Sequence, residues 1–170
     1  MTETIFGIDF GTTNSLASVV AGGQVSSYLD TVNNRPHPST IWYRGADIVV
    51  GQEARLHMDS TNAGAPPGFV TSPKMKLRRE GPIPVDGRLI DPADAVAEVL
   101  RHIKADAAKS RASKAGVDLQ HAVMTIPVDF GGPERRALRK AANKAGISVV
   151  QFVHEPAASL YAYLRSQEDL

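Results

Sequence analysis

The residues from Gly7 to Ser15, with the sequence GIDFGTTNS, carry the kinds of atoms that hold oxyanions. Asp9 lies where an apolar strand gives way to a tight turn, and Gly11 permits positive φ and a close backbone approach. Thr12 and Thr13 add N–H and hydroxyl donors, and donors clustered in a turn bind phosphate much as a helix N-terminus does. A carboxylate beside them repels phosphate unless a cation lies between the two.

We therefore expect Asp9 to hold Mg²⁺ through water, because magnesium gives up its hydration shell reluctantly. The same stretch, taken alone, equally fits an ordinary β-hairpin with a solvated aspartate. The hypothesis needs support from elsewhere in the chain.

Composition narrows the classes of protein. The 170 residues are enough for one compact domain or one lobe of something larger. With 19 Lys and Arg against 18 Asp and Glu, the charge of +1 gives no overall field that would favour nucleic acid or an anionic membrane. The absence of cysteine excludes disulfides and thiolate chemistry and suits a reducing cytosol, so a cytoplasmic location is expected. The sequence shows neither a basic leader nor a long apolar run, so we expect neither a signal peptide nor a membrane span.

The elements that must position the motif differ between the two halves. Turn signals divide the first half into short strands and one short helix. We expect an antiparallel meander at 4–10, 15–21 and 24–32, a loop at 33–39, a hairpin at 40–45 and 47–51, a helix at 52–60, a weakly patterned surface excursion at 61–84, and a small hairpin around Asp86 and Gly87 within 83–90.

The second half alternates helix and strand. Asp91 and Pro92 start a helix whose apolar residues recur at helical spacing and which is expected to end near Gly116. A strand at 121–127, a helix at 132–146, a strand at 147–153 and a helix at 155–167 follow. This alternation predicts a mixed sheet covered by helices, with the site at the strand ends.

A second stretch, VMTIPVDFGGPERRALRKAANKAGISVVQFVHEPAASLYAY, supports the hypothesis. Together the two stretches resemble the ATPase domain of the seventy-kilodalton heat-shock chaperones, the DnaK family of the actin-like superfamily. The likeness rests on GIDxGTTNS, IPxxF and EPAA in this order, and NRPHPSTIWY and VVGQEA match the region between them. It covers nearly the whole chain, and any one of these motifs alone would be weak.

The resemblance implies an α/β fold: an actin-like ATPase lobe with a ribonuclease H-like mixed sheet and a shortened outer subdomain. The central-sheet subdomain would comprise 1–35 and 117–170, and the outer subdomain about 36–116. The family's second phosphate loop, its second lobe and its peptide-binding domain would follow Leu170. This chain alone is therefore expected to be incompetent as an ATPase.

The resemblance also assigns roles to residues. Asp9 is similar to the magnesium-linked carboxylate, and the phosphate-contacting turn is formed by Gly11, Thr12, Thr13 and Asn14. Lys74 is similar to the phosphate-facing lysine, although Lys76 competes for that alignment.

Two further positions match the family. Glu155 resembles the glutamate that orients the magnesium hydration shell and the attacking water, and it also fits a helix N-cap beside Pro156. Pro127 resembles a hinge-like proline, and equally fits a strand terminator. His154 departs from the family, which commonly has asparagine there, so we expect a structural role for it.

The function implied is that of a molecular chaperone of the stress response that binds ATP or ADP with Mg²⁺ and couples hydrolysis to the binding of unfolded peptide clients. J-domain co-chaperones and nucleotide exchange factors are the implied partners, with neither nucleic acid nor a membrane. A filament-forming actin-like protein, a sugar kinase and a non-enzymatic interaction lobe are the alternatives; GTTNS and RPHPS favour the chaperone.

Two helix surfaces need an interpretation. The basic residues of the helix at 132–146 lack interleaved aromatic residues, so we expect a solvated face and not a nucleic-acid patch: Arg135, Arg136, Arg139, Lys140 and Lys144. On the last helix, Leu160 and Leu164 are expected in the core. Tyr161 and Tyr163 are candidates for the core or for a surface that meets the second lobe.

Overall fold

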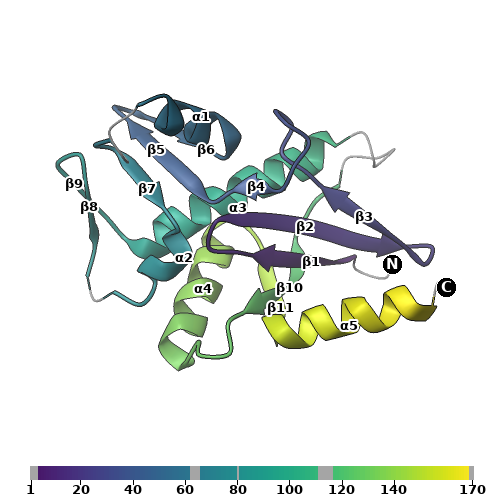
Figure 1. Cartoon of the computed structure of the whole chain (residues 1–170). Coiled ribbons are helices and arrows are strands. Elements are labelled where there is room, and N and C mark those ends of the chain that lie inside the picture. Colours follow the sequence, from purple (N-terminus) through teal and green to yellow (C-terminus); the bar gives the residue numbers. More distant parts are fainter. Residues whose placement is uncertain (1–3, 62–65, 80, 111–116, 169–170) are drawn as a thin grey trace.

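The computed structural model describes residues 4–61, 66–79, 81–110 and 117–168, and its centre is a mixed sheet. The strands lie in the order β11-β10-β1-β2-β3, and β4 pairs with β2 (Figure 1). Their bounds are β1 Ile5–Phe10, β2 Asn14–Ala21, β3 Gln24–Tyr28, β4 His37–Pro38, β10 His121–Ile126 and β11 Ser148–His154. This confirms the mixed sheet and the opening meander that the sequence predicted.

Register decides which residues share an edge of this sheet. β1 runs parallel to β10 with Ile8 opposite Met124, and β10 runs parallel to β11 with Thr125 opposite Val153. The carboxyl ends of these three strands therefore lie together, next to the turn between β1 and β2.

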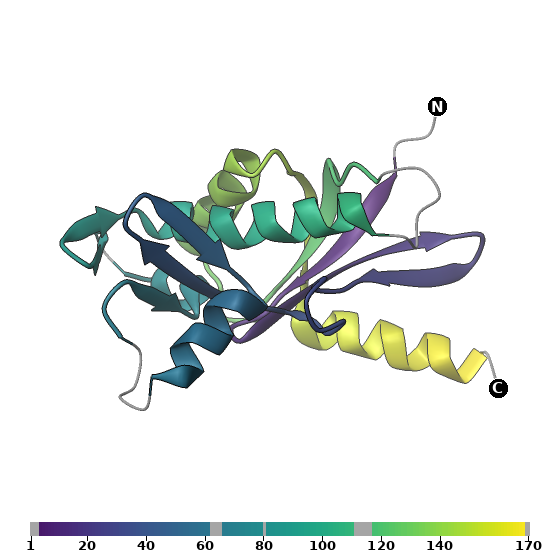
Figure 2. The ribbon, with the colours of Figure 1, turned by 90° about the horizontal axis from the view of Figure 1, so that it is seen from above.

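Helices cover both faces of the sheet (Figure 2). α3 (Pro92–Lys109) and α4 (Gly132–Lys144) lie on one face, and α5 (Glu155–Glu168) lies on the other. The expected cap of α3 is present, because Asp91 Oδ1 accepts a hydrogen bond from the backbone N–H of Ala93 at 2.9 Å. The apolar face of α3 is fully buried, as its spacing predicted: Val96, Val99, Leu100, Ile103 and Ala107.

The remaining elements form a second body of structure beside the central sheet. A three-stranded sheet of β5 (Thr40–Arg44), β6 (Asp47–Val50) and β7 (Phe69–Thr71) packs with α1 (Gln52–Ser60). The hairpin of β8 (Ile83–Val85) and β9 (Arg88–Ile90) lies at its far end (Figure 1). The division into a central and an outer subdomain stays a prediction.

The prediction of a surface excursion at 61–84 is wrong over part of its length. Phe69–Thr71 is a strand on β5, and the short helix α2 (Pro73–Lys76) follows it with Pro73 and Lys74 buried. The prolines and glycines of this region are typical of a loop, and a three-residue strand is too short to show a periodicity in the sequence. Residues 62–65 and Glu80 lie outside the described residues.

Two expectations about helices are also wrong. α3 ends at Lys109, because Ser110 takes an extended backbone, with φ −63° and ψ 129°; Gly116, the expected end, lies outside the described residues. Leu160 and Leu164 are 57% and 50% exposed and do not belong to the core. Only the first turn of α5 is half-buried, so its later apolar residues have no surface to pack on. No helix in the described residues is long and apolar enough to cross a membrane.

Candidate functional site

Asp9 lies at the edge where the three parallel strands end. It is the residue after Ile8 in β1, and Thr125 is the residue after Met124 in β10, so the register places them side by side. Thr125 Oγ1 donates a hydrogen bond to Asp9 Oδ1 at 2.6 Å. This hydrogen bond holds the carboxylate in position, and because Asp9 is exposed, the carboxylate remains accessible to a ligand.

Lys74 reaches the same edge from α2. Its Nζ donates to the backbone carbonyl of Phe10 and to Glu155 Oε1, each at 2.6 Å, and lies 5.7 Å from the centroid of the Phe130 ring. The side chain of Lys74 is 1% exposed and that of Glu155 is 42% exposed. A buried ammonium is costly unless it is paired and hydrogen-bonded, and here it has both kinds of partner.

These contacts bear on the choice between the two lysines. Lys74, and not the half-buried Lys76, joins the strand that leads into the turn to the start of α5. α5 begins at Glu155 directly after β11, so Glu155 lies in the first turn of the helix, and its carboxylate bonds Lys74. The role of Glu155 in orienting water stays a prediction.

The turn after β1 depends on Gly11, but for only one of the two predicted reasons, which were a positive φ and a close backbone approach. Gly11 is not among the residues with positive φ, so that part of the prediction is wrong. The close approach is confirmed: a Cβ on Gly11 would lie well inside 3.0 Å of the Asn14 carbonyl oxygen, closer than real Cβ atoms come. Sterics against the backbone of the turn therefore require glycine here.

Ser39 also holds the turn, although its sequence context predicted no role for it. It is 1% exposed; its Oγ donates to the Gly11 carbonyl at 3.1 Å and lies 3.0 Å from Ser15 Oγ, and its N–H donates to the Thr13 carbonyl at 2.8 Å. Because a trans peptide holds C=O and the following N–H on opposite sides, the Thr12 N–H points away from Ser39. Ser39 thus fixes the direction of a backbone donor.

A cleft of about 920 Å³ opens in front of these residues. Asp9, Gly11, Thr12, Thr125 and Glu155 line one part of it, and the α5 residues Ala158, Ser159, Tyr161 and Ala162 line another. Thr13 and Asn14 are exposed beside it without lining it. The donor set on the Asp9 side consists of carboxylate and hydroxyl oxygens and backbone amides, which fits a hydrated Mg²⁺ with its phosphates and offers nothing to a soft metal.

The comparisons with known proteins agree with this geometry. The sequence model of the family described as Hsp70 protein matches residues 5–65 and 74–169. This chain belongs to the Hsp70 family. The mixed sheet and its helices are those of an actin-like ATPase lobe of an Hsp70 protein, and the filament-forming alternative is not favoured.

The chain is also similar to curated Hsp70 relatives named Chaperone protein DnaK. It is 34% identical to that of Mycoplasma mycoides subsp. mycoides SC over 167 residues, which cover 98% of this chain and 27% of the relative. It is 33% identical to that of Deinococcus radiodurans over 179 aligned residues, which cover 92% of this chain and 27% of the relative. The chain thus spans about a quarter of the length of the relatives it matches.

Two further predicted positions of this Hsp70 chain lie next to the site. Pro127 is half-buried directly after β10, and His154 is the last residue of β11. Within the described part of the chain His154 Nδ1 is buried without a hydrogen-bond partner.

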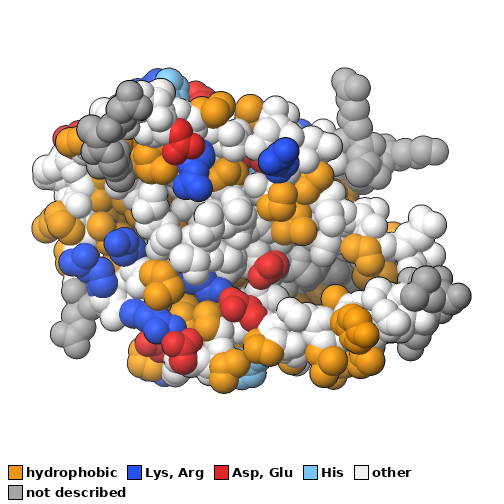
Figure 3. All heavy atoms as spheres, viewed as in Figure 1, with side chains coloured by type: hydrophobic (Ala, Val, Ile, Leu, Met, Phe, Trp, Pro, Cys, Tyr) orange, Lys and Arg blue, Asp and Glu red, His pale blue; other side chains and the backbone are white. Residues whose placement is uncertain are grey.

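The middle of α5 exposes several large apolar side chains. Hydrophobic side chains gather over this helix in Figure 3, and those exposed by half or more are Leu160, Tyr161, Tyr163 and Leu164. In an isolated chain such a patch is a candidate interface. Of the two readings given above for the tyrosines, the exposed one holds.

Proposed function

We propose that this Hsp70-family chain forms one wall of a nucleotide cleft and binds the phosphates of ATP or ADP together with Mg²⁺. The observation that carries the proposal is Lys74, an almost fully buried ammonium held between the Phe10 carbonyl and Glu155 at the edge where Asp9 is exposed. A structural ion pair would not need an accessible carboxylate, a hydroxyl and a glycine turn beside it.

The turn would hold the phosphates. Backbone amides and hydroxyls of Thr12 and Thr13, with Asn14 next to them, are the donors, and Gly11 lets the backbone come close. Asp9 would hold hydrated Mg²⁺, and its hydrogen bond from Thr125 keeps the carboxylate facing the cleft.

Lys74 and Glu155 would act on the reacting groups. Mg-ATP, when bound, supplies the transferable phosphoryl group and the cation that neutralises its charge. The ammonium of Lys74 would stabilise negative charge that develops on the phosphoryl oxygens, and its two hydrogen bonds position it in advance. The partly exposed carboxylate of Glu155 would orient the attacking water and accept a hydrogen bond from it.

We further propose the roles that its relatives' name suggests for a longer protein. Such a protein would be a cytoplasmic chaperone of the stress response that couples ATP hydrolysis to the binding of unfolded peptides, with a J-domain co-chaperone and a nucleotide exchange factor as partners. In it, 1–35 with 117–170 would form the central subdomain and about 36–116 the outer one. A second lobe would complete the clamp on the nucleotide, and the apolar face of α5 is a candidate surface for it.

The test is ATP hydrolysis by a chain that carries this segment and the rest of the relatives' length. Lys74→Ala should lower kcat by roughly 10²–10³-fold, the usual cost of removing one stabilising group. Lys76→Ala is the matched control and should stay within about twofold, since its side chain does not reach Glu155. Equal activity of the two variants and the parent would remove Lys74 from the site.

A second measurement concerns this chain alone. Calorimetric titration of Mg-ADP into the 170-residue chain should give weak or no binding, because one lobe contacts the nucleotide from one side. Micromolar binding that Asp9→Asn abolishes would keep the site and reject the need for a second lobe. No hydrolysis by the longer chain would favour the non-enzymatic alternative.

A further inference from the structure

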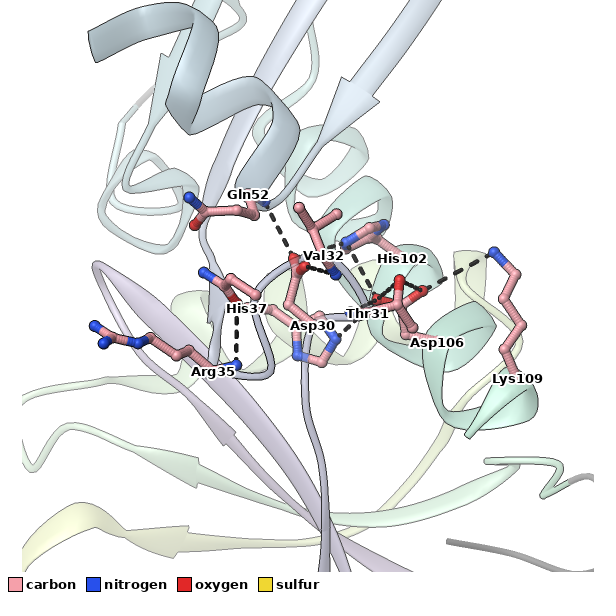
Figure 4. A network of polar contacts seen from close by, with 10 residues as sticks. Asp30, Thr31, Val32, Arg35, His37, Gln52, His102, Asp106 and Lys109 are labelled. Atoms are coloured by element: carbon pink, nitrogen blue, oxygen red, sulfur yellow. Dashed lines mark hydrogen bonds and ion pairs between the residues drawn. The ribbon is translucent and has the colours of Figure 1, made fainter. Parts of the chain in front are cut away.

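A second cluster of ionisable side chains lies away from the nucleotide cleft, between the segment at 30–37, α1 and α3. His37 Nε2 lies 3.3 Å from Asp106 Oδ2, and His102 Nε2 lies 3.7 Å from the same oxygen. Asp30 Oδ2 lies 3.4 Å from His102 Nε2. Figure 4 shows the two rings and the two carboxylates turned toward one another. None of these residues lines the nucleotide cleft.

His37 is the observation that requires an explanation. Its side chain is 0% exposed, and within the described part of the chain neither ring nitrogen has a hydrogen-bond partner. His37 Nε2 lies 3.3 Å from Asp106 Oδ2, which is within ion-pair distance, but the contact does not have the geometry of a hydrogen bond. A buried polar atom without a partner is costly, and one aimed at a carboxylate oxygen suggests a shared third partner.

The spacing of the atoms fits one metal ion. One ligand atom each from His37, His102 and Asp106 lie within 4.8 Å of one another. Tetrahedral zinc has Zn–N and Zn–O distances of about 2.0–2.2 Å, which puts neighbouring ligand atoms roughly 3.3–3.6 Å apart. The 3.3 and 3.7 Å separations to Asp106 Oδ2 lie close to that range.

The surroundings hold the candidate ligands in place. The N–H of Thr31 donates to Asp106 Oδ2 at 3.2 Å, and Asp30 accepts from the N–H groups of Val32 and Gln52 at 2.9 and 3.1 Å. Carboxylates fixed by backbone donors are typical of the outer contacts that orient metal ligands.

Gly51 leaves the room that the cluster needs. It has φ +79°, and a Cβ there would lie 2.5 Å from His102 Nε2. His102 is 25% exposed, which gives an entry path, and Lys109 Nζ at 4.0 Å from Asp106 Oδ1 is a cation at the rim.

We propose that His37, His102 and Asp106 form a structural site for one divalent transition-metal ion, zinc by its ligand set, with Asp30 beside it as the fourth ligand. Two imidazoles with a carboxylate suit zinc and are a poor set for Mg²⁺. The ion would tie the segment at 30–37 to α3.

The test is calorimetric titration of Zn²⁺ into the metal-stripped 170-residue chain, followed by thermal unfolding. We expect one ion per chain and, at a hundredfold excess over Kd, a rise in melting temperature of roughly 5–10 °C. Mg²⁺ at the same concentration should produce no such rise. Wild-type protein without one-to-one binding overturns the proposal, whatever the variants do.

Variants locate the ion. His102→Gln changes a partly exposed residue and should weaken Zn²⁺ binding by roughly a hundredfold or more, and His37→Asn should do the same. The matched control is His57→Gln, an exposed histidine on α1 that packs on Trp42, which should leave the affinity unchanged. If His57→Gln and His102→Gln weaken binding equally, zinc binds adventitiously at the surface. If both leave the affinity unchanged, the ion lies elsewhere and the cluster is only a buried polar network. Circular dichroism shows whether the His37→Asn variant folds. If that variant does not fold, the zinc affinity of His102→Gln alone tests the site.

Discussion

The nucleotide cleft and the histidine cluster are built from the same elementary parts. Each joins distant segments through a buried ionisable group: Lys74 and Glu155 are 81 positions apart, and Thr31 and Asp106 are 75 apart. In the cleft the buried group is fully paired, whereas His37 has no hydrogen-bond partner in the described part of the chain. The difference suggests that a buried ionisable group with all its partners can support a ligand site beside it, whereas a buried polar group without hydrogen-bond partners points to a ligand among its neighbours.

The sharpest way to break the comparison is to disturb the turn of the cleft. Gly11→Ala forces a Cβ into the Asn14 carbonyl, and the surrounding hairpin must shift. We expect a loss of about 3 kcal/mol in the free energy of unfolding, measured by urea denaturation.

Gly7→Ala is the control for that substitution. It lies in the same hairpin, and its Cβ would meet Ser18 Oγ at 3.4 Å, an ordinary contact. We expect a change within about 0.5 kcal/mol. A similar loss for both variants would mean that β1 tolerates no side chain at either glycine, and that the turn is not special.

A second substitution removes only the buried charge of the cleft. Lys74→Met keeps the aliphatic stem but leaves the Phe10 carbonyl and Glu155 without their donor. We expect a loss of about 2 kcal/mol by urea denaturation, reduced by solvent at the partly exposed Glu155. Lys76→Met should change stability by less than about 0.5 kcal/mol. A stabilised Lys74→Met would show that the buried ammonium is retained for the ligand at a cost to the fold.

Much of this architecture could be predicted from the sequence, and the exceptions have physical causes. The motif residues from Asp9 to Asn14 are contiguous, so their chemistry is visible in one short stretch. Thr125 was missed, although a single polar residue in the apolar run AVMTI, one place from the end of a strand parallel to β1, is a usable signal.

The histidine cluster could not be predicted in the same way. Its members come from the loop before β4, from β4 itself and from one face of α3, and nothing local indicates that Asp30 and His102 meet. Lys74 could be named only through the family resemblance, since its burial depends on β7 and α2, which pattern analysis took for a surface excursion. Contacts between distant segments depend on packing, which periodicity alone does not encode.

Ser39 offers a test of whether the two regions are mechanically linked, because it follows His37 and Pro38 of β4 and supports the turn of the cleft. Ser39→Ala should cost about 1–2 kcal/mol of unfolding free energy, because the Gly11 carbonyl loses its donor in a buried place. Ser27→Ala, at an exposed position of β3, is the control and should be near neutral.

The same variant sharpens the comparison through zinc. If Ser39→Ala lowers stability and leaves the zinc affinity unchanged, the cleft and the histidine cluster share a segment but are not energetically coupled. A parallel loss of zinc affinity would mean that β4 couples them.

The smallest expected effect concerns an exposed ion pair. Its contribution to stability is the reference for the contributions of the two buried regions. Lys140 donates to Asp91 Oδ2 at 2.8 Å, and this hydrogen bond, followed by that from the Ala93 N–H, holds the pKa of the Asp91 carboxyl below its ordinary value. Because the folded pKa is the lower one, the charge stabilises the fold above the unfolded pKa, and that contribution is lost as the pH falls through the folded pKa.

Asp91→Asn keeps an amide oxygen that can cap α3 and removes only the charge. We expect a melting temperature lower by about 1–2 °C at pH 7, because exposed pairs contribute little. The difference from wild type should shrink as the pH falls below the ordinary carboxyl range and vanish once the wild-type carboxyl is protonated as well. Asp86→Asn, at the exposed tip of the β8–β9 hairpin, is the control and should leave the melting temperature at pH 7 within about 1 °C of wild type. If the Asp91 variant instead cost as much as Lys74→Met, burial would not be what separates the cleft lysine from the charges on the surface, since an exposed ion pair would then stabilise this fold equally well.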